Sequence, residues 1–134
     1  MTLKNRATPS TNRIAPKNLD VDHSNMDRHP KFSLKYLVKQ FSIDKCESEE
    51  KAAFADKLHR MSQQVWSEIF KGARHGSGFE KLGKGKNFNW IQDIFNDKNI
   101  IAFRFSSLKA MIGFLDNEVL YILGLDRNFT AYKH

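Results

Sequence analysis

An amphipathic segment spans residues 48–72 and reads SEEKAAFADKLHRMSQQVWSEIFKG. Its large apolar residues recur at spacings of three and four, and they are Phe54, Leu58, Met61, Val65 and Ile69, with Trp66 and Phe70 beside them. This spacing places them on one face of an α-helix. Ser48 is suited to cap the start of that helix, and Gly72 is suited to end it. The segment therefore predicts one long helix with a single buried face.

The residues after position 100 predict an antiparallel meander. Apolar and other residues alternate over residues 101–105, which is typical of a strand with one face on the core. Residues 111–115 and 119–125 are two further apolar runs, and the Asp-Asn pair at 116–117 between them is a turn signal. The run 119–125 is almost entirely apolar, which predicts a central strand covered on both faces. A short segment, residues 129–134, follows.

The part before the helix predicts a tail and one more strand. Residues 1–30 contain all three prolines and no helical or strand period, which predicts a flexible basic and polar tail. Apolar residues alternate over residues 32–38, as in a half-buried strand. We therefore expect a single α+β domain over residues 31–134, in which one long helix and a short one pack on a small antiparallel sheet of about four strands.

A basic, glycine-rich stretch follows the helix. Five of the seven glycines lie within residues 71–87, where one acid, Glu80, stands against the cations Lys71, Arg74, Lys81, Lys84 and Lys86. Glycines let backbone amides approach a phosphate, and His75 next to Arg74 adds a titratable group. We expect a flexible phosphate-binding loop here, followed by a short helical turn near residues 90–95. A solvated loop with incidental charge is the alternative.

Composition excludes several classes of protein. The 22 Lys and Arg against 15 Asp and Glu give a net charge of +7, which attracts polyanions such as nucleic acids. No apolar run is long enough to cross a membrane and no secretion signal is evident, so a cytoplasmic protein is expected. Cys46 is the single cysteine, which excludes an internal disulfide. The five histidines lack metal-ligand spacing, and no catalytic or cofactor motif is present, so neither a metal nor a cofactor is expected.

The C-terminal end carries the second candidate site. Arg127, Tyr132 and His134 follow the last apolar run closely. If the meander is antiparallel, Lys109 and Arg104 lie on the same sheet. One surface would then hold arginine, lysine, tyrosine and histidine, which suits a developing negative charge on phosphorus.

This pattern resembles the RelE/ParE superfamily of small bacterial toxins. Those proteins commonly have a basic residue entering one strand, a short acidic turn, an apolar strand, an arginine and a near-terminal tyrosine. The corresponding features here are Lys109, residues 116–118, residues 119–125, Arg127 and Tyr132. The order of strand, helix, basic linker and meander is also similar, although many relatives carry two helices in a hairpin.

The resemblance implies a toxin that cleaves mRNA without a metal. Arg127 would stabilise the scissile phosphate, and Tyr132 would assist proton transfer or stack on a base. Lys109 stands where many relatives have arginine, and His134 would act as general acid or base. Lys81, Lys84 and Lys86 correspond loosely to the family's basic linker. The RNA 2′-hydroxyl would attack the adjacent phosphate to give a 2′,3′-cyclic phosphate, and a cognate antitoxin would cover the basic surface.

Three other functions remain open at this point. A non-catalytic nucleic-acid-binding module would use the same basic loop and exposed aromatic residues. A ParE-like gyrase poison would share the fold without the nuclease residues. A small interaction domain would use its positive charge only to complement an acidic partner.

Overall fold

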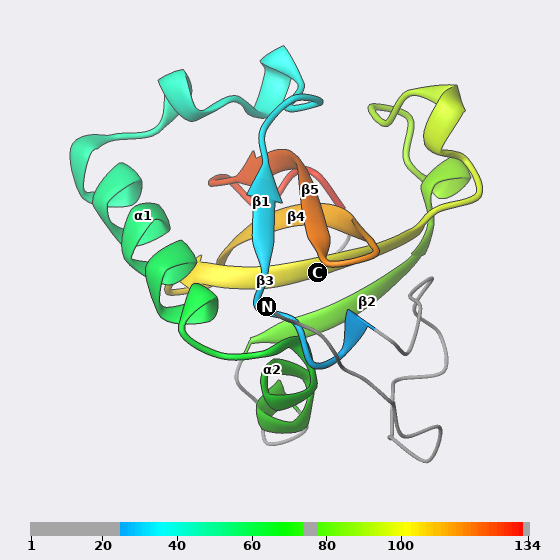
Figure 1. Ribbon diagram of the computed structural model, residues 1–134. Coiled ribbons are helices and arrows are strands. Elements are labelled where there is room, and N and C mark those ends of the chain that lie inside the picture. Colours follow the sequence, from blue (N-terminus) through cyan, green and yellow to red (C-terminus); the bar gives the residue numbers. More distant parts are fainter. Residues whose placement is uncertain (1–24, 74–77, 133–134) are drawn as a thin grey trace.

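The computed structural model describes residues 25–73 and 78–132, in which five strands form one mixed sheet (Figure 1). The order across the sheet is β1-β5-β4-β3-β2. The strands are β1 (Lys31–Ser33), β2 (Phe79–Lys84), β3 (Asn99–Ser106), β4 (Lys109–Asp116) and β5 (Val119–Asp126). All neighbours pair antiparallel except β1, which runs parallel to β5. The expected α+β class is confirmed, but the sheet has more strands than expected and is not purely antiparallel.

The predicted meander is β3, β4 and β5. Residues Ala110 to Leu115 of β4 are all buried, so this central strand is covered on both faces. Asn117 has a φ of 56°, a left-handed conformation that asparagine tolerates in the tight turn between β4 and β5. The short segment after β5 adds no strand within the described residues, where it forms bends.

The predicted long helix is in fact two helices, α1 (Ser48–Ser62) and α2 (Trp66–Ala73). Tertiary contacts of Trp66 account for the break. Its indole N–H donates to the Glu118 carbonyl at 2.9 Å, and its backbone N–H donates to the Arg28 carbonyl at 3.0 Å. The Glu68 carboxylate accepts the Val65 backbone N–H at 3.0 Å, which caps α2 in place of a continuing helix.

The predicted basic loop contains the edge strand β2, which the sequence did not indicate. Phe79–Lys84 pairs antiparallel with β3, and the pairing shifts register between Lys81 and Gly83. Gly83 has a φ of +92°, a conformation that suits glycine, so its presence marks a bulge in a strand and not only a loop. Beyond β2 come two 3-10 turns, η5 (Gly85–Asn87) and η6 (Asp93–Phe95), and η6 is the short helical turn expected near residues 90–95.

The N-terminal expectations hold only in part. The first strand ends at Ser33, after which the chain makes the 3-10 turns η3 (Lys39–Phe41) and η4 (Ile43–Lys45). Residues 1–24 of the predicted tail lie outside the described residues. Met26 is fully buried in the core, so the packed part of the chain begins earlier than residue 31.

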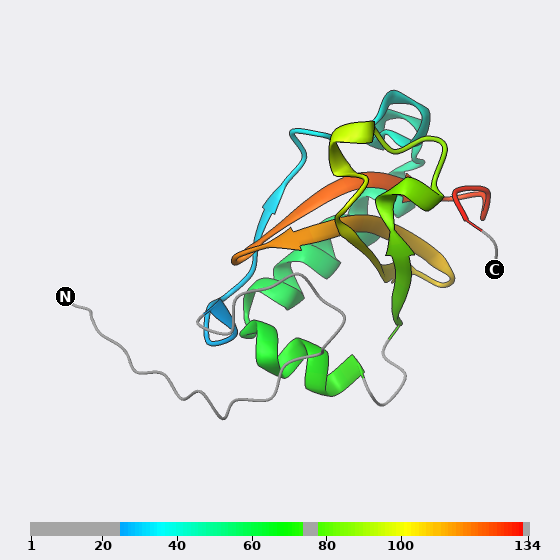
Figure 2. The same cartoon turned by 90° about the vertical axis from the view of Figure 1, so that its right-hand side faces the viewer.

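The sheet separates two apolar cores. The helices α1 and α2 lie on one face of the sheet and the 3-10 turns η3, η5 and η6 lie on the other (Figure 2). The face that carries α1 and α2 is here called the helix face, and its core includes Phe54, Trp66, Phe70, Phe103 and Met111. The opposite face is here called the turn face, because η3, η5 and η6 cover it. Its core includes Phe41, Ile91, Phe95, Ile112 and Phe114. No described helix is long and apolar enough to cross a membrane.

Candidate functional site

Two of the predicted catalytic cations meet a buried carboxylate on the helix face. The Lys109 ammonium donates to Oε2 of Glu50 at 2.5 Å, and the Arg127 Nε–H donates to its Oε1 at 2.7 Å. The side chain of Glu50 is only 6% exposed, whereas those of Lys109 and Arg127 are 30% and 23% exposed. Lys109 and Arg127 are therefore brought together as predicted, around an acid that the sequence analysis did not single out.

The charge of Glu50 is strongly stabilised. The hydrogen bonds from Arg127 and Lys109, with a third from the Glu47 backbone N–H, lower the pKa of Glu50 to about 2. The same pairing raises the pKa of Arg127. Glu50 and Arg127 are therefore charged at neutral pH, and the carboxylate holds the Arg127 and Lys109 side chains in place.

The start of α1 explains why Glu50 lies there. Glu47, and not the expected Ser48, is the cap residue, and it forms a capping box with Glu50: each side chain accepts a hydrogen bond from the other residue's backbone N–H. In the sequence, this capping box is indicated by two acids, Glu47 and Glu50, that stand three positions apart. Cys46, next to the cap, is buried, and burial raises the pKa of its thiol, as expected for a structural cysteine.

Tyr132 belongs to a second group, on the turn face. Its hydroxyl donates to Oε1 of Glu80, on β2, at 2.8 Å. Burial first, and then the bond and charge of Glu80, raise the pKa of Tyr132 well above its usual value, while the charge of Arg104 acts in the opposite direction. Tyr132 is therefore a protonated donor at neutral pH, and Glu80 is a second functional candidate that the sequence analysis noted only as the lone acid of a basic stretch.

Arg104 lies on the same face as Tyr132. Phe103 and Phe105, its neighbours on β3, pack into the core of the helix face, so Arg104 projects from the turn face. Its side chain is exposed and lies over Gly78, where an added Cβ would be 3.0 Å from the Arg104 Cβ. A carboxylate, a phenol and a guanidinium, here called the Glu80 group, are thus gathered on one accessible surface.

The turn after β5 holds Tyr132 in place. Asp126 is fully buried, and its Oδ1 accepts the backbone N–H groups of Thr130 at 2.9 Å and Ala131 at 3.2 Å. The Trp90 indole N–H donates to the Ala131 carbonyl at 2.8 Å. These contacts fix the backbone next to Tyr132 without using its hydroxyl.

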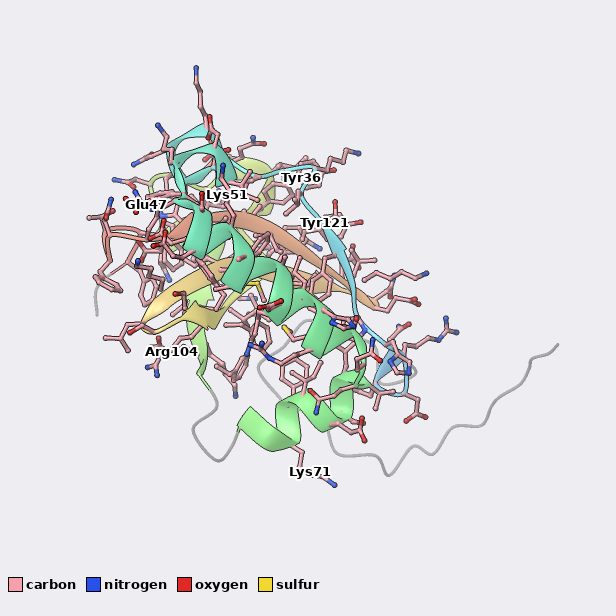
Figure 3. All side chains as sticks on the ribbon, turned by 90° about the vertical axis from the view of Figure 1, so that its left-hand side faces the viewer. Tyr36, Glu47, Lys51, Lys71, Arg104 and Tyr121 are labelled. Carbon is pink, nitrogen blue, oxygen red and sulfur yellow. The ribbon has the colours of Figure 1, made fainter. Side chains whose placement is uncertain are left out.

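The predicted site is therefore divided between two faces at one end of the sheet. Figure 3 shows Glu47, at the start of α1, and Arg104 at the same end of the molecule. Lys109 and Arg127 lie on the helix face with Glu50, while Tyr132 and Arg104 lie on the turn face with Glu80. The single surface expected from the sequence does not form.

Of the remaining predicted cationic residues, the structure describes three, Lys81, Lys84 and Lys86. Lys81 and Lys84 are exposed on the edge strand β2, and Lys86 is exposed in η5. The Lys84 ammonium donates to the Asp97 carbonyl at 3.1 Å. Arg74, His75 and His134 lie outside the described residues. In residues 25–73 and 78–132, no three His, Cys, Asp or Glu side chains are grouped so that they could hold a metal ion.

Comparisons of this chain with protein-family models, with curated proteins and with solved structures found no match.

Proposed function

We propose that this protein is a metal-independent endoribonuclease whose reacting groups are Glu80, Tyr132 and Arg104. The observation that carries the proposal is the hydrogen bond between Tyr132 and Glu80 on an exposed surface that also holds Arg104. Cleavage of RNA by its own 2′-hydroxyl needs a base, a proton donor and a cation near the phosphate. The Glu80 group supplies one of each.

The proton transfers balance within this group. The Glu80 carboxylate accepts the proton of the 2′-hydroxyl while the bond from that oxygen to phosphorus forms. The bond from phosphorus to the 5′-oxygen breaks, and Tyr132 donates its proton to the leaving oxygen. The proton on Glu80 then returns to Tyr132 through their hydrogen bond, which restores both groups. Arg104 stabilises the charge that develops on the phosphate oxygens.

Several features support a role as a RelE-like toxin within this proposal. Two helices follow the first strand and a meander follows them, which is compatible with the resemblance, although a five-stranded mixed sheet is not specific to that superfamily. Lys109, Arg127 and Tyr132 have the expected order along the chain. In this proposal Arg127 binds a phosphate next to the reacting one, mRNA is the substrate, and a cognate antitoxin covers the basic surface.

One observation favours a second candidate, a nucleic-acid-binding module without catalysis. Lys109 and Arg127, the cations that the resemblance places at the reacting phosphate, are already paired with Glu50. An RNA phosphate would share Arg127 with that carboxylate, which suits binding better than stabilisation of a transition state.

Induced expression in a bacterial host tests the proposed function. We expect growth arrest with cleaved transcripts for the unchanged protein, and normal growth for the Arg104→Ala/Tyr132→Phe variant. Arg60→Ala/Tyr121→Phe makes the same chemical changes away from the Glu80 group and is expected to arrest growth like the unchanged protein. Soluble expression with intact transcripts would contradict the proposal, and arrest with intact RNA would favour a gyrase-type target.

A further inference from the structure

A small pocket lies at the C-terminal end of β5, beside the Glu50 ion pairs. Its volume is about 140 Å³, and it is formed by the turns η3 and η4 on one side and by the chain after β5 on the other. Its lining residues are Gln40, Phe41, Lys45, Leu125, Arg127, Asn128 and Thr130. Among the predicted site residues that the structure describes, Arg127 alone lines this pocket.

The lining is of mixed chemistry. Phe41 and Leu125 supply apolar surface, and the side chains of Gln40, Asn128 and Thr130 can both donate and accept hydrogen bonds. A cavity of about 150 Å³ accommodates one six-membered ring. The pocket therefore matches a flat, single-ring ligand with polar edges, and the second ring of a two-ring ligand would extend beyond the lining residues.

Two cations line the pocket. Lys45 is exposed, and Arg127 donates its Nε–H to Glu50 while its Nη2 lies 3.7 Å from the Glu47 carboxylate. Since Glu50 engages one edge of the guanidinium, the carboxylate fixes its direction. A single-ring ligand that carries a phosphate would use both properties of the lining.

The walls are held rigidly. The Phe41 ring meets the Trp90 ring edge to face at 4.8 Å between centroids, and Trp90 is itself bonded to the Ala131 carbonyl. Phe129 has a φ of 61°, an unusual backbone for a bulky residue, and it lies between the two lining residues Asn128 and Thr130. Backbone strain of this kind is concentrated at functional sites, and a preformed pocket loses less entropy on binding.

We infer that this pocket is a subsite for one pyrimidine base of RNA, with the adjoining phosphate bound by Arg127 and Lys45. The inference rests on the proposed function for its choice of RNA as the ligand. It adds a base preference to that function, because the second ring of a purine would extend beyond the lining residues.

Binding of mononucleotides to the full chain tests the subsite separately from cleavage. We expect uridine 3′-monophosphate to bind in a calorimetric titration and to shift the amide resonances of Asn128 and Thr130. Asn128→Ala and Gln40→Ala are each expected to weaken that binding about fivefold, as for one lost hydrogen bond. The exposed residues Asn89 and Gln92 give the matched controls Asn89→Ala and Gln92→Ala, which are expected to bind normally.

Two further probes can overturn the inference. Adenosine 3′-monophosphate and inorganic phosphate are expected to bind at least about tenfold more weakly than the uridine nucleotide. Equal binding of either probe, or an unchanged affinity of Asn128→Ala, would show that no pyrimidine is recognised.

Sequencing of cleaved RNA ends separates this inference from the proposed function. We expect a pyrimidine beside the cut, and we expect Asn128→Ala to cut without that preference. Cleavage without base preference in the unchanged protein would overturn the subsite and leave the nuclease proposal intact. Specific uridine nucleotide binding without any RNA cleavage would support the subsite and contradict the nuclease proposal.

Discussion

The Glu50 carboxylate, in the first turn of α1, connects that helix to the sheet through ion pairs. Its carboxylate accepts the capping N–H of Glu47 and also binds Lys109 on β4 and Arg127 just after β5. Breaking a buried ion pair by removing one partner is more costly than never forming it, since the remaining charges lose their compensation. Glu50 is therefore expected to matter for stability as well as for the direction of Arg127.

Glu50→Gln tests this role through pH. We expect the variant to lose about 2 kcal/mol of unfolding free energy at pH 7, less than the ~3 to 5 kcal/mol of a fully buried pair because both cations are partly hydrated. The pKa of Glu50 is lowered from 4.5 to about 2 on folding, so its contribution is present above pH 4.5 and is lost as the pH falls towards 2. Urea denaturation should thus show a smaller difference between variant and parent at pH 3 than at pH 7.

The exposed Glu49 provides the control on the same helical turn. Glu49→Gln is expected to keep the parental stability at both pH values. A Glu50→Gln variant that differs from the parent equally at pH 3 and pH 7 would contradict the role of the charge.

At the scale of residues, the sequence could predict that Lys109 and Arg127 lie close together, but not to which face of the sheet Tyr132 and Arg104 point. Lys109 and Arg127 were expected to act together, and they do meet. Tyr132 and Arg104 were expected beside them, but the alternation along β3 and the turn after β5 direct both to the other face of the sheet. The chemistry of a side chain follows from its residue type alone, whereas the face of the sheet to which it points depends on the strand register.

At the scale of elements, local pattern and tertiary contact compete. The three strands of the meander were predictable because apolar residues fill both faces of the central strands. The break between α1 and α2 was not, because it follows from hydrogen bonds of Trp66 to chain segments remote in sequence. Strand β2 was not predicted because Gly83, which lies at a bulge of this strand, is also typical of a loop when only the sequence is known.

Gly113 tests how tightly β4 and β5 are joined. A Cβ at this position would lie 2.0 Å from the Tyr121 carbonyl oxygen, beside the register shift between the two strands. Because backbone has to move, we expect Gly113→Ala to lose at least about 2 kcal/mol of unfolding free energy, towards the upper part of the range for overpacked sites. Thermal or urea denaturation measures this loss.

Gly72, in α2, is the matched control because no atom lies within 4 Å of an added Cβ. Gly72→Ala is expected to raise the stability by up to about 1 kcal/mol, since alanine favours a helix more than glycine does. A Gly113→Ala protein as stable as the parent would show that the close approach of the strands is unimportant.

At the scale of the whole molecule, one end of the sheet concentrates the chemistry. The Glu50 ion pairs, the Glu80 group and the pocket all lie where β3 and β5 end and β4 begins. The turn over residues 126–132 contributes at least one side chain to each of the three. The net charge of +7 favours a polyanion as the partner of this end. Composition favours a polyanionic ligand, whereas the carboxylates that organise the cations are evident only in the folded structure.

Cleavage of a single-stranded RNA oligonucleotide by the purified protein, in the presence of a metal chelator, tests the central claim most directly. We expect fragments that end in 2′,3′-cyclic phosphate and 5′-hydroxyl groups, and a rate about 10² to 10⁴ times lower for Glu80→Gln, as for loss of a general base. Glu49→Gln is expected to cut at the parental rate. Parental cleavage by Glu80→Gln, or RNA that is bound but left intact by the unchanged protein, would contradict the account.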